Sequence, residues 1–216
     1  SSIYAPTIWS WVFQNGSPAT STLSNPSVQW STPGTYPVAL TASNAFGNNT
    51  KTKLSYITVA GPIALPLNEG FESSVFLPLN WTPNNVYNDN IDWVRQTGVG
   101  GFGTSTACAM FDNYNVDAAG ERDEIRTPKH IFTNVANATL RFDVAYARYN
   151  MYYTDTLEVK LSTNCGFTWT SIYLKGGTAL STSPDLAANT FTPTNAQWRT
   201  DSVDISLLTA GQGNVM

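Results

Sequence analysis

Carboxylates are the side chains in this chain that are best suited to chemistry, and they are few. Aspartate and glutamate together number 15 among 216 residues, and several lie beside expected strand ends. Calcium takes six to eight oxygen ligands, commonly carboxylates and backbone carbonyls. The sequence therefore favours a structural calcium site, with the candidate ligands Glu72, Asp112, Asn113, Asp123 and Asp155. Ordinary surface acids are the competing interpretation of the same residues.

Paired carboxylates also allow a catalytic interpretation, in which one acid and one base cleave a glycosidic bond. The pairs that could do so are Glu69 with Glu72 and Asp123 with Glu124. The single histidine, His130, has no sequence context for a triad, and the chain contains no His-Glu-x-x-His zinc motif. We therefore predict no catalytic residues in this chain and a structural role for His130.

A tyrosine-rich segment is the best candidate for a binding surface. Residues 148–153 read Arg-Tyr-Asn-Met-Tyr-Tyr, and tyrosine rings can stack on sugars or anchor a peptide. We expect Arg141 and Asp143 on the non-core face of the preceding strand, beside small alanines that leave a shallow groove. The predicted binding residues are Arg141, Asp143, Arg148, Tyr149, Tyr152 and Tyr153. The alternative is that the tyrosines pack against the other sheet and that Arg141 and Asp143 form a surface pair.

Strands must position these residues, because the apolar pattern of the chain has a period of two. Apolar and other residues alternate over 36–42, 140–147 and 157–161, which places the apolar set on one face of a sheet. No helical periodicity is sustained. Turn signals separate the runs, at Asn15-Gly16, Asn25-Pro26, Pro33-Gly34, Gly47-Asn48 and Asn164-Cys165-Gly166. Many short strands divided by turns predict an all-β fold, either a sandwich or a barrel.

A domain boundary is expected where two prolines and a glycine follow a strand that ends at Val59. Residues 61–67 read Gly-Pro-Ile-Ala-Leu-Pro-Leu, which is typical of a short and fairly stiff linker. The sequence therefore predicts one domain over residues 1–60, a linker over 61–67 and a second domain over 68–216.

The charge and cysteine content limit the partners and the chemistry of the chain. Charged residues make up 12% of it, and the formal net charge is -4. Nucleic-acid binding normally needs a basic face, so we predict no nucleic-acid partner. No apolar run approaches the roughly 20 residues of a membrane span, and we predict none. Cys108 and Cys165 could form one disulfide in an oxidising compartment or remain two free thiols.

The first predicted domain carries a set of residues typical of one module. They are Trp9-Ser10-Trp11-Val12-Phe13, Ser21-Thr22, Asn25-Pro26, Gly34-Thr35-Tyr36-Pro37-Val38-Ala39-Leu40, Asn44 and Tyr56-Ile57-Thr58-Val59. In these types and spacings, residues 9–59 resemble a PKD domain, an immunoglobulin-like module of many bacterial surface proteins. The resemblance implies a sandwich that acts as a spacer and in some members helps to bind polysaccharide. Trp11 and Phe13, with Tyr36, Val38 and Leu40 from another strand, can fill a small core between two sheets.

The first domain also departs from the PKD pattern at two places. Gln14-Asn15-Gly16 stands where the family usually has Gly-Asp-Gly, and Trp30 replaces the tyrosine that follows Asn-Pro. The family's first strand is expected to precede residue 1, so we expect this domain to be truncated at its N-terminus.

The second predicted domain carries another set of short motifs. They are Glu69-Gly70-Phe71-Glu72, Leu79-Asn80-Trp81, Ile91-Asp92-Trp93, Gly100-Gly101-Phe102-Gly103, Met110-Phe111-Asp112-Asn113, Asp123 to Pro128, Leu140 to Tyr146 and Asp155-Thr156-Leu157. With these motifs, residues 68–216 resemble the MAM and cleaved-adhesin group of jelly rolls, which includes the choice-of-anchor domains. The resemblance implies a jelly-roll sandwich, a structural calcium in many members, and export by the type IX route. It also implies a frequent neighbour, a pappalysin-like metallopeptidase or another catalytic domain.

The resemblance further implies a closing strand that would begin at Asn214-Val215-Met216. We therefore expect the second domain to be truncated at its C-terminus and to have an open sheet edge. Such an edge would be filled by strand exchange with another copy of the chain or exposed to solvent.

Residues 162–169 are similar to an Asp box, Ser-x-Asp-x-Gly-x-Thr-Trp, with Asn164 at the aspartate position. The box occurs in sialidases and in many proteins that are not enzymes. We expect a structural hairpin turn in which the Asn164 side chain caps the backbone and Gly166 adopts a positive φ.

Together these features predict a non-catalytic accessory or adhesion region of a secreted bacterial multidomain protein. It would bind glycan or protein at the cell surface and would space or target an associated catalytic domain. The alternatives are a part of a secreted hydrolase, either a metallopeptidase or a glycoside hydrolase, and a purely structural stalk.

Overall fold

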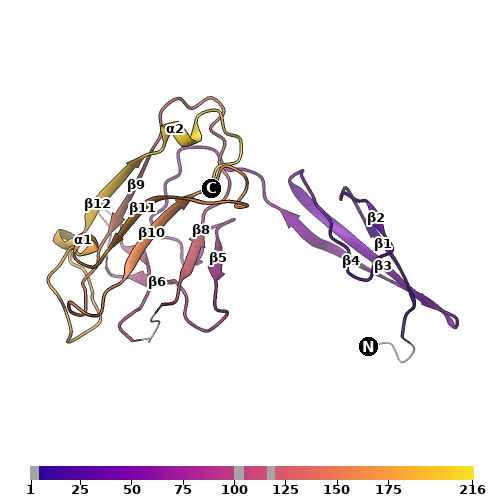
Figure 1. The fold of residues 1–216 in the computed structure, drawn as a ribbon, viewed down its shortest axis with the longest axis horizontal. Coiled ribbons are helices and arrows are strands. Elements are labelled where there is room, and N and C mark those ends of the chain that lie inside the picture. Colours follow the sequence, from indigo (N-terminus) through magenta and orange to yellow (C-terminus); the bar gives the residue numbers. More distant parts are fainter. Residues whose placement is uncertain (1–4, 100–104, 116–119) are drawn as a thin grey trace. The chain divides into compact units, whose positions relative to one another are not determined.

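The prediction of an all-β fold is confirmed by the computed structural model, in which strands hold 38% of the residues and helices 5%. The structure describes residues 5–99, 105–115 and 120–216, so the motif Gly100-Gly101-Phe102-Gly103 lies outside the described residues. The chain divides into two compact units, Ser1–Gly61 and Pro62–Met216 (Figure 1).

The first unit is built on one antiparallel sheet with the strand order β2-β1-β3-β4. Its strands are β1 (Ile8–Phe13), β2 (Thr20–Ser21), β3 (Gly34–Asn44) and β4 (Gly47–Val59). This arrangement differs from the sequence-based expectation. Residues 11–13 and 36–40 were expected to face each other from two sheets, but they lie on neighbouring strands of one sheet. Strand β1 pairs with β3 along its whole length, and Phe13 lies opposite Val38. The side chains of such a pair project from one face of the same sheet.

Aromatic rings cover the buried face of this sheet. Phe13 stacks on Trp11 with the ring centroids 5.7 Å apart, and it meets the Trp30 ring edge-on at 5.9 Å. Trp30 comes from the long connection between β2 and β3, and its indole nitrogen donates to the Gln14 carbonyl at 2.9 Å. Gly16, in the turn between β1 and β2, packs against the same connection. A Cβ atom on Gly16 would lie 2.7 Å from Val28 Cγ1, so the close approach requires glycine at position 16.

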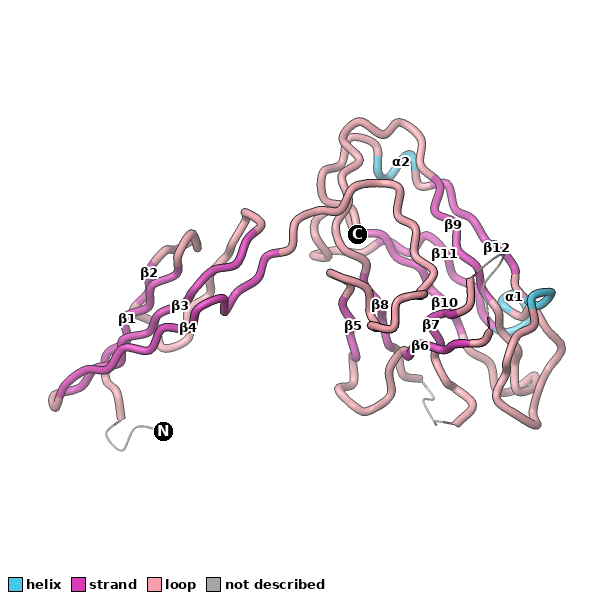
Figure 2. The backbone as a smooth tube through the Cα atoms, turned by 180° about the vertical axis from the view of Figure 1, so that it is seen from behind, coloured by secondary structure: helices cyan, strands magenta, loops and turns pink. Residues whose placement is uncertain are grey.

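The described residues of the second unit form four two-stranded antiparallel ladders, which are β5–β8, β6–β7, β9–β12 and β10–β11 (Figure 2). Their strands are β5 (Thr82–Asn85), β6 (Val94–Thr97), β7 (Ala107–Met110), β8 (Asp123–Arg126), β9 (Thr139–Val144), β10 (Thr156–Leu161), β11 (Thr170–Gly176) and β12 (Arg199–Asp204). Short helical turns in the described part of this unit are α1 (Gly177–Leu180), η1 (Asn195–Gln197) and α2 (Ser206–Thr209).

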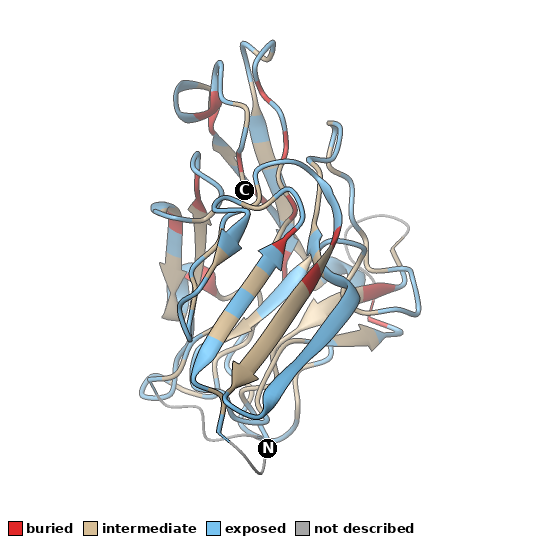
Figure 3. Ribbon diagram, turned by 90° about the vertical axis from the view of Figure 1, so that its right-hand side faces the viewer, coloured by how far each residue is buried: buried red, intermediate tan, exposed pale blue. Residues whose placement is uncertain are grey.

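Burial alternates along β9 and β12 of the second unit, as a period of two predicts, whereas residues 157–161 of β10 show no such alternation. In β9, Leu140 and Phe142 are more buried than Thr139, Arg141 and Asp143. Figure 3 shows the ribbon coloured by burial, with exposed and intermediate stretches along the strands. The main apolar cluster consists of Phe132, Leu161, Ile205 and Val215. Partly buried residues that pack on it include Leu65, Leu140, Ile172 and Val203.

A buried carboxylate joins two of the ladders. Asp201 on β12 accepts hydrogen bonds from the Tyr173 hydroxyl at 2.6 Å and the Lys175 ammonium at 3.1 Å, both on β11. It also forms a bidentate pair with Arg199, at 2.9 and 3.0 Å. Burial alone would raise the pKa of Asp201, but the bonds from Arg199, Tyr173 and Lys175 lower it to about 2. The Arg199 guanidinium also donates to the carbonyls of Leu180 and Ser181 at the end of α1.

We predict that Asp201→Asn lowers the free energy of unfolding of the second unit by about 2 kcal/mol at neutral pH, because one amide oxygen cannot replace two charged acceptors. The stabilisation by the wild-type carboxylate is fully present above the unfolded pKa of about 3.9 and is lost as the pH falls toward 2. Denaturant unfolding measures the effect. The exposed Asp143→Asn is the control and is expected to change stability by about 0.5 kcal/mol or less; equal losses in both variants would contradict the prediction.

Candidate functional site

The predicted tyrosine segment forms an exposed aromatic surface. Its members, here called the tyrosine surface, are Tyr114, Tyr149, Met151, Tyr152 and Tyr153. Tyr152 is 82% exposed and Tyr153 is 68% exposed. The Tyr149 ring lies between two others, with its centroid 6.2 Å from that of Tyr114 and 5.7 Å from that of Tyr153. The Tyr149 ring therefore contacts those of Tyr114 and Tyr153, and the exposure of Tyr152 and Tyr153 argues against the alternative that these two rings pack against a sheet.

Local hydrogen bonds fix the loop that carries these rings. The Asn150 side-chain oxygen accepts from the backbone N–H of Tyr152 at 2.8 Å and of Tyr153 at 3.1 Å, which forms an Asx turn. At the base of the loop, the Tyr146 hydroxyl donates to Asp155 Oδ2 at 3.0 Å and accepts from the Asp155 N–H at 2.8 Å. Burial raises the pKa of Tyr146 to about 12, so this hydroxyl keeps its proton at neutral pH.

Arg148 positions the loop. Its guanidinium binds Asp185 through two bonds, at 2.8 and 3.0 Å, and its carbonyl accepts from the Leu186 N–H at 2.8 Å. On the neighbouring loop, the Asn115 amide donates to Thr190 Oγ1 at 3.1 Å. Three segments that are distant in sequence are thus held together beneath the tyrosine surface, and the Arg148 charge is already paired.

The structure does not gather all six predicted binding residues. Arg141 and Asp143 are exposed on β9, where they lie opposite Ser202 and Thr200 of β12. Thr200 Oγ1 donates to Asp143 at 2.6 Å, and in residues 5–99, 105–115 and 120–216 neither Arg141 nor Asp143 has a hydrogen bond or ring contact with the tyrosine surface. Sequence reasoning missed Tyr114, because nothing local in the sequence links it to Tyr149.

The predicted calcium ligands do not converge on one point. Glu72 accepts from Ser105 Oγ at 2.8 Å, from the Thr106 N–H at 2.7 Å and from Thr106 Oγ1 at 2.6 Å. The two Thr106 bonds, followed by the Ser105 bond, lower the pKa of Glu72 to about 2. Asp112, which precedes Asn113, caps its own turn by accepting from the Tyr114 and Asn115 N–H groups at 3.2 Å.

Asp123 is the predicted ligand whose carboxylate is not already used. In the described part of the chain, its two oxygens are buried and accept no hydrogen bond. Burial raises the pKa of Asp123, and the negative charges of Asp89 and Asp92 raise it further. Even so, the described residues contain no group of three or more His, Cys, Asp or Glu side chains placed to hold a metal ion. The five predicted ligands do not fit a single calcium ion, and the presence of calcium stays a prediction.

We predict that Asp123→Asn raises the melting temperature by about 3 °C at pH 7 in the presence of a chelator, because it removes an ionised carboxylate that has no hydrogen-bond donor. The folded-state pKa is raised, so the penalty for ionisation appears as the pH rises above about 4 and is absent below it. Thermal scans at pH 7 and below about pH 4 measure the difference in melting temperature between the variant and the wild type. If calcium raises the wild-type melting temperature but leaves that of Asp123→Asn unchanged, Asp123 holds a cation.

The Asp123–Glu124 pair is not arranged as an acid and a base. Asp123 and Glu124 are consecutive in β8, so their side chains project to opposite faces and cannot act on one substrate. Glu124 binds Arg126 at 2.8 Å and Asn84 at 2.9 Å. Burial would raise the pKa of Glu124, but the Arg126 bond and charge, with smaller contributions from Lys160 and Asn84, lower it. A lowered pKa does not suit a general acid.

His130 has the structural role that the sequence predicts. It is 4% exposed, and its Nδ1 lies 3.0 Å from the Ile63 carbonyl. Burial lowers the pKa of His130. Among the described residues, its Nε2 is buried without a partner, which favours the neutral ring that donates from Nδ1.

We predict that stability falls as the pH decreases from about 6.5, because the unfolded chain takes up a proton that buried His130 accepts only at lower pH. His130→Asn keeps a side-chain N–H for the Ile63 carbonyl and does not titrate. Melting temperatures between pH 7 and pH 5 should therefore fall less in this variant than in the wild type. Parallel curves for the two proteins would show that another group causes the loss.

The turn similar to an Asp box is structural, as predicted. Asn164 Oδ1 accepts from the Thr168 N–H at 2.8 Å, Ser162 Oγ accepts from the Gly166 N–H at 2.8 Å, and Gly166 has a φ of 82°. Cys108 and Cys165 are free, which decides between the two alternatives for them. Burial raises the pKa of the Cys108 thiol, so this thiol is less reactive than an exposed one.

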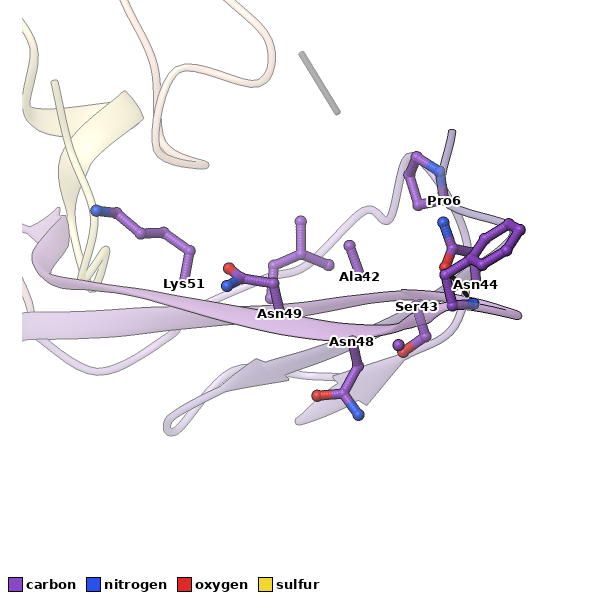
Figure 4. Close-up of a pocket in the computed structure, with 10 residues that line it drawn as sticks. Pro6, Ala42, Ser43, Asn44, Asn48, Asn49 and Lys51 are labelled. Atoms are coloured by element: carbon purple, nitrogen blue, oxygen red, sulfur yellow. Dashed lines mark hydrogen bonds between the residues drawn. The ribbon is translucent and has the colours of Figure 1, made fainter. Parts of the chain in front are cut away.

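Two shallow hollows lie on the first unit. One, of about 510 Å³, is lined by the end of the β3–β4 hairpin, including Ala42, Asn44, Asn49 and Lys51 (Figure 4). The other, of about 440 Å³, is lined by aromatic residues that include Trp11, Trp30 and Tyr56. Neither hollow is lined by a carboxylate, a histidine or a cysteine, so neither presents acid–base or metal chemistry.

Comparison with known proteins supports the assignment of the first unit. A family model described as PKD domain matches residues 2–59. PKD domains are non-catalytic modules that are commonly extracellular and act in adhesion or as spacers. Searches of curated proteins and of solved structures find no match to the chain. The jelly-roll and MAM resemblance of the second unit therefore stays a prediction. In the part of the chain that the structure describes, no helix is long and apolar enough to cross a membrane.

Proposed function

We propose that this chain, whose first unit matches a PKD domain, is a non-catalytic adhesion region of a secreted bacterial protein and binds glycans through the tyrosine surface of its second unit. The first unit serves as the spacer, and an associated catalytic domain, such as a metallopeptidase, is the partner that the region targets at the cell surface. The single observation that carries the binding role is the exposed row of contacting rings from Tyr114, Tyr149 and Tyr153, beside the exposed Tyr152.

Exposure of a large aromatic cluster needs an explanation, because burial of apolar rings is favourable. Tyr149, Tyr152 and Tyr153 are 43%, 82% and 68% exposed although Asn150 holds their backbone in a fixed turn. A rigid loop that presents rings to solvent loses little entropy when a ligand binds. These features are typical of a preformed binding surface.

A glycan suits this surface better than a charged partner does. Tyrosine rings provide flat faces for sugar rings, and Asn115, which follows Tyr114 in the chain, carries a polar amide group. The Arg148 guanidinium, which precedes Tyr149 in the chain, is neutralised by Asp185 in a bidentate pair. A neutral polar ligand with flat apolar faces therefore matches the surface, and a protein ligand is the alternative outcome of the experiment.

We predict that the wild-type chain binds a subset of glycans on an array and that Tyr152→Ala and Tyr153→Ala each weaken this binding about tenfold, because each removes an exposed stacking face. Calorimetry with a glycan selected from the array measures the dissociation constants.

Phe167→Ala is the matched control, because Phe167 is an aromatic residue of the same unit that is 88% exposed and outside the tyrosine surface. It should leave the affinity unchanged. Unaltered glycan binding by both tyrosine variants would refute the proposal, and binding of a protein ligand in place of glycans would reassign the surface to protein adhesion.

A further inference from the structure

The ring faces of the tyrosine surface point in two directions. The planes of Tyr149 and Tyr153 are inclined by 86°, with their centroids 5.7 Å apart. The planes of Tyr114 and Tyr149 are inclined by only 36°, with a centroid distance of 6.2 Å. The three rings therefore form an angled surface, in which Tyr153 is turned away from the other two, and not a flat platform.

Rings on both sides of this angle reach solvent. Tyr153 is 68% exposed, Tyr149 is 43% exposed and Tyr114 is 42% exposed. In an edge-to-face pair, the edge of one ring covers one face of the other and does not close off the rest of either ring. A ligand can therefore touch Tyr149 and Tyr153 at the same time. It would do so with groups that are neighbours within the ligand, because the two ring centroids are only 5.7 Å apart.

Backbone hydrogen bonds hold the segments that carry the rings. Asn150 Oδ1 accepts from the Tyr153 N–H at 3.1 Å, and Asp112 Oδ1 accepts from the Tyr114 N–H at 3.2 Å. Neither bond involves an aromatic ring, so both leave the ring faces to a ligand. A preformed arrangement favours ligands whose shape already matches it, because little ordering is then needed on binding.

The angle between the rings limits the shape of a glycan that can stack on both. A sugar lies against a tyrosine with its ring roughly parallel to the aromatic plane, because its apolar C–H groups then contact the aromatic face. Sugars stacked on Tyr149 and Tyr153 therefore lie nearly at right angles to each other. A β-linked glucan of the cellulose type is an extended ribbon whose sugars share nearly one plane, so it can stack on only one of these two rings.

An α-linked glucan of the amylose type has the opposite property. Its linkages turn the chain at every sugar, so the chain coils and successive sugars face in different directions. Such a chain can place one sugar on Tyr149 and a neighbouring sugar on Tyr153. It keeps a conformation that it already favours in solution, which lowers the entropy cost of binding.

We propose that the tyrosine surface binds a glycan chain that turns between neighbouring sugars, of the class of α-linked glucans, and discriminates against flat β-linked chains. This inference rests on the glycan-binding role proposed above and adds the shape of the ligand. Tyr149 and Tyr153 determine the specificity, since the angle between their planes matches a chain that turns.

The test compares two soluble hexasaccharides, maltohexaose and cellohexaose, by calorimetry with the 216-residue chain. Both consist of the same six-sugar chain of glucose and differ in the configuration of the linkage. We expect maltohexaose to bind about tenfold more tightly, because cellohexaose forms one stacking contact fewer.

Tyr153→Ala separates the role of the angle from that of aromatic area. It removes one side of the angle and leaves the more nearly parallel rings of Tyr114 and Tyr149. We expect the affinity for maltohexaose to fall about tenfold and that for cellohexaose to stay unchanged, so that the preference between the two sugars disappears. Phe167→Ala, at an exposed position outside the tyrosine surface, should keep both affinities. Thermal scans verify that both variants are folded.

The outcomes separate this inference from the proposed function. Tighter or equal binding of cellohexaose by the wild type would overturn the inference and leave the glycan-binding role in place. An equal loss of affinity for both sugars in Tyr153→Ala would do the same, because the angle would then have no part in selection. Failure to bind either hexasaccharide would also overturn the inference, whereas the glycan-binding role itself fails only if the array and the tyrosine variants described above give its refuting result.

Discussion

The carboxylate of Asp201 joins strands that cannot stabilise themselves. Isolated two-stranded ladders are marginal in water, and the strands described for the second unit form four of them. Asp201 on β12 binds Tyr173 and Lys175 on β11, and the Phe142 ring on β9 meets Tyr173 edge-on at a centroid distance of 5.0 Å. Polar and aromatic contacts at one point therefore connect the β9–β12 and β10–β11 ladders. The apolar cluster around Phe132 and Leu161 adds the non-directional part of the same connection.

The proposed binding surface depends on this connection. The loop that carries Tyr149, Tyr152 and Tyr153 connects the end of β9 to the start of β10. Its two ends therefore keep their separation only while the β9–β12 and β10–β11 ladders stay together. The contact between Tyr146 and Asp155 closes the base of the loop, and Asn150 sets its tip. A rigid base allows exposed rings to keep one arrangement, which a mobile loop of the same composition would not.

The acids of this chain act mainly in structure. Glu72 ties the segment before β5 to the start of β7, Asp112 caps a turn, and Asp185 holds Arg148. In each case, protein donors take the lone pairs that a metal ion or a catalytic proton would need. A chain with few charges thus uses its carboxylates as hydrogen-bond acceptors at positions where separate segments meet. Asp123, whose oxygens accept no hydrogen bond among the described residues, is the exception.

The sequence by itself determined the features that depend on neighbours in the chain. The period of two specified strands at residues 36–42, at 157–161 and at 140–144 of the predicted run 140–147, since β9 ends at Val144. The Asn164 turn followed from residue types over a few positions. Only the tertiary structure decided that β1 lies beside β3, that Tyr114 joins Tyr149, and that Val215 and Met216 lie between two other segments. The physical reason is that side-chain alternation states which face of a strand is buried but not which strand lies beside it. That choice depends on long-range packing and on hydrogen bonds between strands, and a local stretch of sequence contains only one of the two partners in each such contact.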